Sequence, residues 1–325
     1  MKTILNLTVA GVAAMAGAAQ AETTIRFGHM NSPTHFVNTA ISSMAEAIST
    51  RTDGEVVFEM FPSGQLGETS QVVEQIALGS DMASQVGPGS IANFVPDFDI
   101  IAFPFMYDGM EDAQRLLDSD VIAELEARAE AEANIKVMCY FAFGIRDLYT
   151  RETEVHAPED MAGLSVRVQP VTMYTELVKQ VFGAAPTPMP WPDVYSALAQ
   201  GVIDAAEAPP AAILDQRHYE SARYLIQTNH ILDISPIIIA ASTFNGLAED
   251  QQAIVLEEAQ VACDEMTAAA LGGYEAGIEE LRANGMTIIS DIDRAAFSAR
   301  AAGIADSFPN WSEGLFERAR AAIDG

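Results

Sequence analysis

Arg167 and Trp191 are the two side chains of this 325-residue sequence best suited to hold a small organic acid. The guanidinium of an arginine is a planar fork that matches both oxygens of a carboxylate through parallel hydrogen bonds. Residues 164–168 alternate apolar and polar types as a half-buried strand does, so Arg167 lies on the face opposite its apolar neighbours. That face could equally point to solvent, and the residues around Trp191 favour the binding interpretation.

The segment that carries Trp191 is stiffened by proline. Prolines at positions 186, 188, 190 and 192 hold the chain extended, so the indole is presented from a rigid support. Pro192 and Asp193 suit the first turn of a helix that ends at Gly201. An aromatic ring supplies apolar contact area at little entropic cost. A fixed aromatic plane near an arginine therefore predicts a pocket for a small acid.

Polar residues at predicted strand and helix ends are further candidates for ligand contact. The loop 29–35 follows the first predicted strand, and α/β sheets bind ligands beyond the carboxyl ends of their strands, so Asn31 and His35 are candidate hydrogen-bonding groups. Glu68 and Glu207 are candidate acceptors for ligand hydroxyls, although Glu68 could equally be a favourable charge at a helix N-terminus. The two histidines of the loop have no acid or cysteine beside them. We therefore expect no metal, no cofactor and no catalytic residue.

A series of longer motifs surrounds these residues. They read P-E-D-x-x-G-L-x-x-R-V at 158–168, G-A-x-P-T-P-M-P-aromatic at 183–191 and V-Y-x-A-L-x-x-G-V-x-D at 194–204. F-P-S-G-Q-L-G at 61–67 and F-P-F-M-Y at 103–107 lie upstream. Together they resemble the periplasmic substrate-binding proteins of tripartite ATP-independent periplasmic (TRAP) transporters. The resemblance extends to about residue 300.

The resemblance implies roles for individual residues. Arg167 would pair with the carboxylate of the ligand, and Arg146 would assist it. Two positions depart from the family pattern: Ile145 replaces the usual aromatic residue before Arg146, and Ala208 stands where a ligand-contacting asparagine is common. The missing amide leaves a space for water, a bulkier ligand group or an apolar one. With the flat face of Trp191, this space favours a hydroxylated monocarboxylate such as a sugar acid; the alternatives are a C4-dicarboxylate and a small keto or hydroxy acid.

Alternating strand and helix patterns predict an α/β fold. The resemblance implies the two-lobed periplasmic-binding-protein fold, with two mixed or parallel sheets flanked by helices and a long helix spanning both lobes. That helix is expected within residues 248–284, bent at Gly272-Gly273. We expect lobe I to contain residues 22–145 and 232–272. We expect lobe II to contain residues 146–231 and 273–325.

The N-terminal segment and the net charge indicate the location and the partners of the protein. Residues 1–21 have a positive start, a short apolar middle and an Ala-Gln-Ala end, which predicts a signal peptide cleaved after Ala21 and a periplasmic protein. The net charge of −29 becomes −30 when Lys2 is removed. Such an acidic surface argues against nucleic acid or an anionic membrane as a partner. The two cysteines, Cys139 and Cys263, could be buried thiols or could form one disulfide. We favour buried thiols, because a chain of this size does not need a disulfide to be stable.

Three classes of function remain for this sequence. The leading hypothesis is a monomeric binding protein whose two lobes close over a small organic acid and deliver it to a TRAP membrane permease. A secreted enzyme is the competing class, because Asp193, Asp204 and Glu207 could serve as acid and base. The sequence contains no nucleophile elbow, zinc-binding helix motif or phosphate loop. A binding protein for an ATP-driven importer would share the lobes but not the pattern at 186–204.

Overall fold

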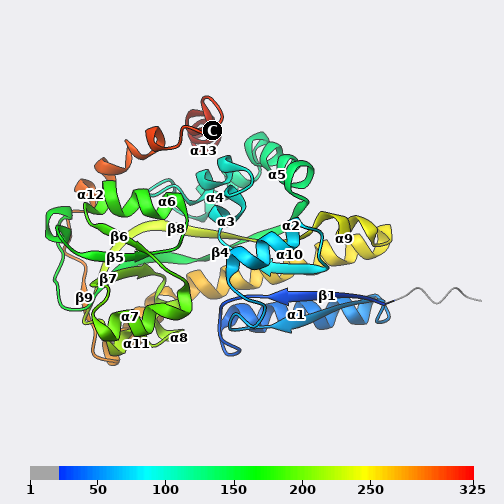
Figure 1. Cartoon of the computed structure of the whole chain (residues 1–325), viewed down its shortest axis with the longest axis horizontal. Helices are drawn as coiled ribbons and strands as arrows, with labels where there is room; N and C mark the ends of the chain where they lie inside the picture. The colour runs from blue at the N-terminus through cyan, green and yellow to red at the C-terminus, as the bar shows by residue number, and fades with distance from the viewer. Residues whose placement is uncertain (1–21) are drawn as a thin grey trace, which may run out of the picture.

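The computed structural model describes residues 22–325, which form two lobes joined by one continuous sheet (Figure 1). The predicted signal peptide lies outside the described residues. The strand order is β2-β1-β3-β8-β4-β7-β5-β6, and β9 pairs with β8. The strands are β1 (Thr23–Gly28), β2 (Val56–Phe61), β3 (Met82–Gln85), β4 (Ile135–Thr150), β5 (Ser165–Val168), β6 (Ala185–Pro188), β7 (Ala205–Ala208), β8 (Tyr224–Ala240) and β9 (Thr287–Ile289).

Helices cover both lobes around this sheet. Lobe I carries α1 (Phe36–Arg51), α2 (Thr69–Ala77), α3 (Pro88–Ala92), the 3-10 helix η1 (Pro96–Ala102), α4 (Met110–Leu117), α5 (Asp120–Ala133) and α9 (Ala241–Gly246). Lobe II carries α6 (Thr172–Glu176), α7 (Val194–Gln200), α8 (Pro210–Asp215) and α12 (Arg294–Ala301). None of the helices within residues 22–325 has both the length and the apolarity needed to cross a membrane.

The long antiparallel strands β4 and β8 run through both lobes (Figure 1). They have 16 and 17 residues and belong to one sheet, whereas the resemblance implies two sheets. The mixed α/β class and the two-lobed fold are confirmed, but the sheet is continuous. Three register shifts in the β4–β8 ladder allow it to bend between the lobes without losing its pairing. The strand also continues through Gly144, whose φ of 146° suits glycine.

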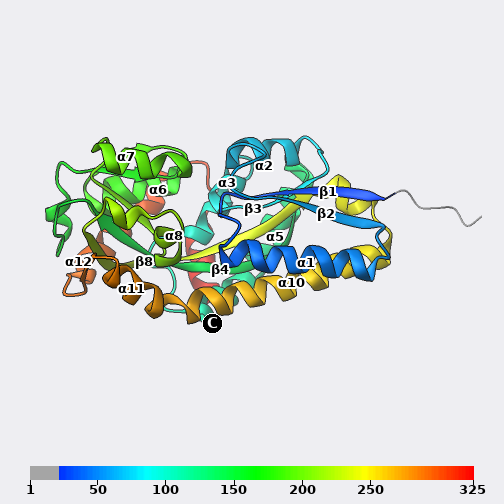
Figure 2. The ribbon, with the colours of Figure 1, turned by 90° about the horizontal axis from the view of Figure 1, so that it is seen from below.

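The predicted long helix is present and bends where expected. It consists of α10 (Glu249–Gly272) and α11 (Tyr274–Ala283), with Gly273 between them. Figure 2 shows α10 beside α1 under lobe I and α11 under lobe II. Helix α10 packs against β4, and α11 packs against α8. This element therefore joins the two lobes along the side opposite α2 and α7.

The C-terminal segment differs from the expectation that it completes lobe II. Helix α13 (Leu315–Asp324) packs against α4, α5 and η1 of lobe I. Arg320 donates a hydrogen bond to the carbonyl of Met106 at 3.0 Å, and the ring centroids of Phe316 and Phe103 are 4.8 Å apart. Helical periodicity predicts that α13 has an apolar face, but only tertiary structure decides which surface covers that face.

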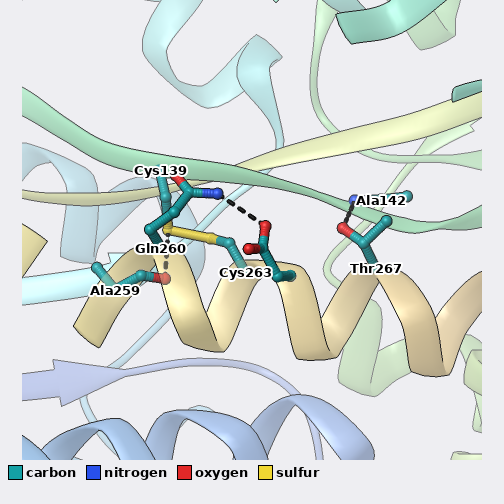
Figure 3. The surroundings of a disulfide bond; sticks show 7 residues. Cys139, Ala142, Ala259, Gln260, Cys263 and Thr267 are labelled. Carbon is teal, nitrogen blue, oxygen red and sulfur yellow. Dashed lines mark hydrogen bonds between the residues drawn. A yellow bond between two sulfur atoms is a disulfide. The ribbon is translucent and has the colours of Figure 1, made fainter. Parts of the chain in front are cut away.

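A disulfide joins Cys139 of β4 to Cys263 of α10, so the prediction of buried thiols is wrong (Figure 3). The two cysteines are 124 residues apart, and only the packing of α10 on β4 brings them together. Both lie in an apolar cluster formed by α1, α10 and the sheet of lobe I. One turn further along α10, the Thr267 hydroxyl accepts a hydrogen bond from the Ala142 N–H at 3.0 Å (Figure 3). The bridge is therefore part of a continuous α10–β4 contact.

Candidate functional site

A cavity lies between the lobes, and measured out to its open mouth it encloses about 990 Å³. Its lining combines apolar and aromatic side chains with a small number of polar groups, as sites for small molecules do. Lobe I contributes residues from the loop after β1, the start of α2, the β3–α3 region and β8. Lobe II contributes residues from the ends of β5, β6 and β7. The polar and aromatic lining residues are Asn31, Glu68, Thr69, Ser70, Gln85, Ser90, Asn93, Phe143, Arg146, Arg167, Gln169, Trp191, Asp233 and Ser235.

Arg167 presents one edge of its guanidinium to this cavity. Its side chain is fixed because Nε and one terminal nitrogen donate to the carbonyl of Met189 at 3.1 and 3.0 Å. An arginine has five N–H donors, so the edge between its two terminal nitrogens stays open. Burial lowers the pKa of Arg167 to about 10, with the Glu207 charge acting in the opposite direction, so the side chain is cationic at neutral pH. This open edge fits the two oxygens of a carboxylate.

Trp191 lies against the same arginine. The guanidinium carbon of Arg167 is 5.0 Å from the centroid of the Trp191 ring. His218 supports the indole edge-on with ring centroids 4.7 Å apart, and the His218 ring nitrogen Nδ1 lies 2.7 Å from the Tyr149 hydroxyl. Burial lowers the pKa of His218 to about 3, so this histidine is a neutral support for the aromatic wall. The proline-rich segment thus holds an aromatic plane at the lining, as the sequence predicts.

Arg146 also reaches the cavity, but most of its donors are already used. Its Nε bonds the Glu207 carboxylate, one terminal nitrogen donates to Glu207 Oε1 at 2.8 Å and to the Glu207 carbonyl at 2.9 Å, and the other donates to Asp233 Oδ2 at 2.6 Å. At most one of its five hydrogens is left for a ligand. Arg146 also lies 5.2 Å from the Tyr174 ring centroid. Burial would lower the pKa of Arg146, but Glu207, Tyr174 and Asp233 raise it well above the usual value.

Glu207 faces away from the lining. Its side chain has no exposed surface, and both its carboxylate oxygens pair with Arg146. His230 Nε2 lies 3.3 Å from the same carboxylate. Burial would raise the pKa of Glu207, but Arg146 and His230 lower it to about 2. Glu207 thus fixes Arg146 behind the cavity wall, in a position that does not suit the hydroxyl-acceptor role predicted from the sequence.

The remaining predicted site residues divide between the lining and its support. Asn31, Glu68 and Ala208 line the cavity, and Asn31 donates to Gln85 Oε1 at 3.2 Å. Glu68 is also the N-cap of α2 in a capping box with Gln71. His35 lies outside the lining, where it caps α1 and stacks on Phe143 with ring centroids 5.7 Å apart. Burial lowers the pKa of His35 to about 4, so it supports the wall in its neutral form.

Asp233 is a charged lining residue that is absent from the predicted site. It lies within the apolar run 231–241, where an isolated carboxylate is a signal that could have identified it. Its side chain is 5% exposed and pairs with Arg146. The sequence does not single out Gln85, Ser90, Asn93 or Ser235 either, because uncharged polar residues in loops and strands are common and give little indication of a site. Among residues 22–325, no three His, Cys, Asp or Glu side chains gather so that they could hold a metal ion.

The two lobes also touch each other around this cavity. Ser32 of lobe I donates its backbone N–H to Asp215 of lobe II at 3.3 Å. On another side, α3 of lobe I approaches the loop that follows β5 in lobe II, where Gly89 faces Val171. A site enclosed by two touching lobes is typical of proteins that close around a ligand.

Residues 27–310 match the model of the bacterial extracellular solute-binding proteins of family 7. The chain belongs to this family. The 2,3-diketo-L-gulonate-binding periplasmic protein of Escherichia coli (strain K12) is 29% identical to it over 292 residues, which are 90% of this chain and 88% of that protein. The resemblance to TRAP solute-binding proteins is confirmed, and members of the family bind solutes rather than transform them.

Solved structures of family members share the whole fold. A TRAP periplasmic solute-binding protein from Actinobacillus succinogenes 130z, with bound L-galactonate, superposes with a TM-score of 0.88 at 28% identity, covering 93% of this chain and 99% of that one. A TRAP periplasmic solute-binding protein from Fusobacterium nucleatum, with bound sn-glycerol-3-phosphate, also gives a TM-score of 0.88 at 28% identity, covering 93% and 97% of the two chains. Similar folds in this family therefore hold chemically different anions.

Proposed function

We propose that this chain binds a sugar acid in the periplasm and delivers it to the membrane permease of a TRAP transporter. The observation that carries the proposal is the cavity itself. The open guanidinium edge of Arg167 lies beside Trp191 on one side, and amides, hydroxyls and the carboxylates of Glu68 and Asp233 line the other. A carboxylate fits the arginine edge, the ring face suits C–H groups, and the amides and hydroxyls suit ligand hydroxyls.

The similar proteins support this choice of ligand class. The Escherichia coli relative is named for 2,3-diketo-L-gulonate, and the Actinobacillus structure contains L-galactonate. Both compounds are hydroxylated carboxylates. Ala208, which stands where the resemblance implies an asparagine, lies on the cavity lining, and its small side chain takes up less of that space than an asparagine would. A compact C4-dicarboxylate or pyruvate would leave that space and the aromatic face unused.

Thermal-shift and calorimetric screening of residues 22–325 tests the proposal. The panel contains L-galactonate and 2,3-diketo-L-gulonate as sugar acids, with succinate, malate, pyruvate and sn-glycerol-3-phosphate as competitors. A cognate sugar acid at about 100 times its dissociation constant should stabilise the protein by about 2.7 kcal/mol. Recovery of the ligand unchanged and in stoichiometric amount separates a binder from an enzyme. If a competitor shifts the midpoint and neither sugar acid does, the ligand assignment is wrong.

A further inference from the structure

Arg167 is the basic residue of the cavity lining whose charge is left without a partner. Among the described residues, the lining contains two basic side chains, Arg146 and Arg167, and two acidic ones, Glu68 and Asp233. The charge of Arg146 is matched by Glu207 and Asp233, both within ion-pairing distance. Arg167 forms no ion pair within residues 22–325 and bonds only a backbone carbonyl. The cavity therefore has one cationic group to offer an incoming anion.

Asp233 lies on the side of the cavity away from Arg167. In the sheet order, Asp233 on β8 and Arg167 on β5 have β4 and β7 between them. Neighbouring strands are about 4.8 Å apart, so the two backbones are separated by roughly 14 Å. Apart from Arg146, whose charge is already matched, the lining groups near Asp233 are uncharged: Ser235 follows it on β8, and Gln85 lies on the neighbouring strand β3. A ligand held by its carboxylate at Arg167 extends its other end toward these groups.

We propose that Asp233 makes the cavity selective for ligands that carry a single carboxylate. This inference rests on the proposed function and names a finer ligand class within it, the aldonic acids rather than the aldaric acids. A terminal hydroxyl can donate a hydrogen bond to the Asp233 carboxylate or to Gln85. A second carboxylate at the same place has no donor-rich partner and meets a like charge.

The selectivity arises from the negative charge that Asp233 adds to the Arg146–Glu207 pair. Arg146 and Glu207 form a buried pair of zero net charge by themselves. If Asp233 is ionised, the group of three residues is negative and repels a second carboxylate. Burial raises the pKa of the Asp233 carboxyl, and its ion pair with Arg146 opposes that rise and favours the charged form. His230 lies behind Glu207 and is not part of the lining, and its pKa is lowered by burial, so it adds no positive charge.

Two pairs of ligands test the inference, because the members of each pair differ only in a second carboxylate. L-Galactonate and galactarate differ at carbon 6, and 4-hydroxybutyrate and succinate form the compact pair. Calorimetry on residues 22–325 at neutral pH should show galactonate binding at least about tenfold more tightly than galactarate, since two like charges a few ångströms apart in a partly desolvated site repel strongly. Asp233→Asn should reduce that ratio to about threefold or less. Asp118→Asn, the same charge change on the exposed surface, should leave the ratio unchanged.

The outcomes separate this inference from the proposed function. Equal or tighter binding of galactarate by the wild-type protein overturns the selectivity, even if Asp233→Asn fails to fold, and leaves the sugar-acid proposal standing. Binding of 4-hydroxybutyrate over succinate, with neither sugar acid bound, supports the selectivity and overturns the sugar-acid proposal. Failure of all four acids to bind overturns both. A ratio that is the same in the wild type and a folded Asp233→Asn variant shows that Asp233 is not its source.

Discussion

Gly89 of lobe I faces Val171 of lobe II so closely that a β-carbon on Gly89 would lie 2.2 Å from Val171 Cγ1. Gly89 lies within α3 and has no positive φ, so it is the space, rather than the backbone conformation, that requires glycine. Real β-carbons do not approach other atoms this closely, so a larger residue at position 89 would push the lobes apart. The space between Gly89 and Val171 therefore depends on how far the two lobes have closed over the cavity.

Gly89→Ala should weaken ligand binding by holding the lobes apart. Overpacking of this kind costs about 1–3 kcal/mol, which corresponds to roughly a five- to 150-fold loss of affinity. Solution scattering with saturating L-galactonate should give a larger radius of gyration for the variant than for the wild type. Gly246→Ala is the matched control, because no atom lies within 4 Å of its added β-carbon. Equal affinity and equal scattering in both variants would show that closure does not depend on this contact.

Arg146→Ala should destabilise the protein, in contrast to a substitution of Arg167. Its removal leaves the carboxylates of Glu207 and Asp233 buried without their cation. Breaking a buried ion pair from one side costs about 3–5 kcal/mol. Denaturant unfolding measures this loss as a lower midpoint. A variant with the wild-type midpoint would mean that the two carboxylates find other partners.

Asp147 gives the protein a pH-dependent component of stability. Its carboxylate accepts hydrogen bonds from the Tyr274 hydroxyl at 2.7 Å and the Asn229 N–H at 2.9 Å, beside the bend between α10 and α11. Burial raises the pKa of Asp147 to about 7, with the two hydrogen bonds opposing the rise. The folded protein thus holds this proton more tightly than the unfolded chain, whose aspartate pKa is about 3.9. Stability from this group is lost as pH rises from about 4 to about 7.

Asp147→Asn removes that component, so the variant should gain stability relative to the wild type as pH rises. The difference in the free energy of unfolding between the two proteins should change by up to about 1.4 kcal/mol per pH unit in this interval and level off above pH 7. Urea unfolding at pH 4.5, 6 and 8 measures it. A difference that is constant across these pH values would show that Asp147 ionises normally in the folded protein.

Replacement of Cys139 and Cys263 by alanine should lower stability while leaving ligand affinity nearly unchanged. The disulfide joins β4 to α10 within lobe I and lies outside the cavity lining. Loss of a native disulfide typically costs about 2–5 kcal/mol, chiefly through the unfolded chain. Thermal unfolding of the variant and calorimetry with L-galactonate give the two quantities. A large loss of affinity at temperatures where the variant stays folded would reveal coupling between α10 and the cavity.

The sequence predicts individual residues of the site better than it predicts contacts between residues that are far apart in the chain. Arg167 and Trp191 belong to one stretch of chain with local signals, and the structure brings them together at the lining. Arg146 and Asp233 are 87 residues apart, and only the pairing of β4 with β8 makes them neighbours. Together with the pairing of β4 and β7, which brings Glu207 close, it makes Arg146 the partner of two carboxylates instead of a free ligand-binding cation. The disulfide was missed for the same reason, since its two residues meet only through the packing of α10 on β4.

The central claim is that the open edge of Arg167 holds the carboxylate of the ligand, and calorimetry of Arg167→Ala with L-galactonate tests it most directly. Removing one partner of a desolvated charge pair typically costs about 2–5 kcal/mol, or roughly thirty- to several-thousand-fold in affinity. Galactitol, which carries a hydroxymethyl group in place of the carboxylate, is the matched ligand and should bind weakly and equally to both proteins. A folded Arg167→Ala variant should therefore lose at least about thirtyfold in affinity for L-galactonate. A change of less than about threefold would contradict the account.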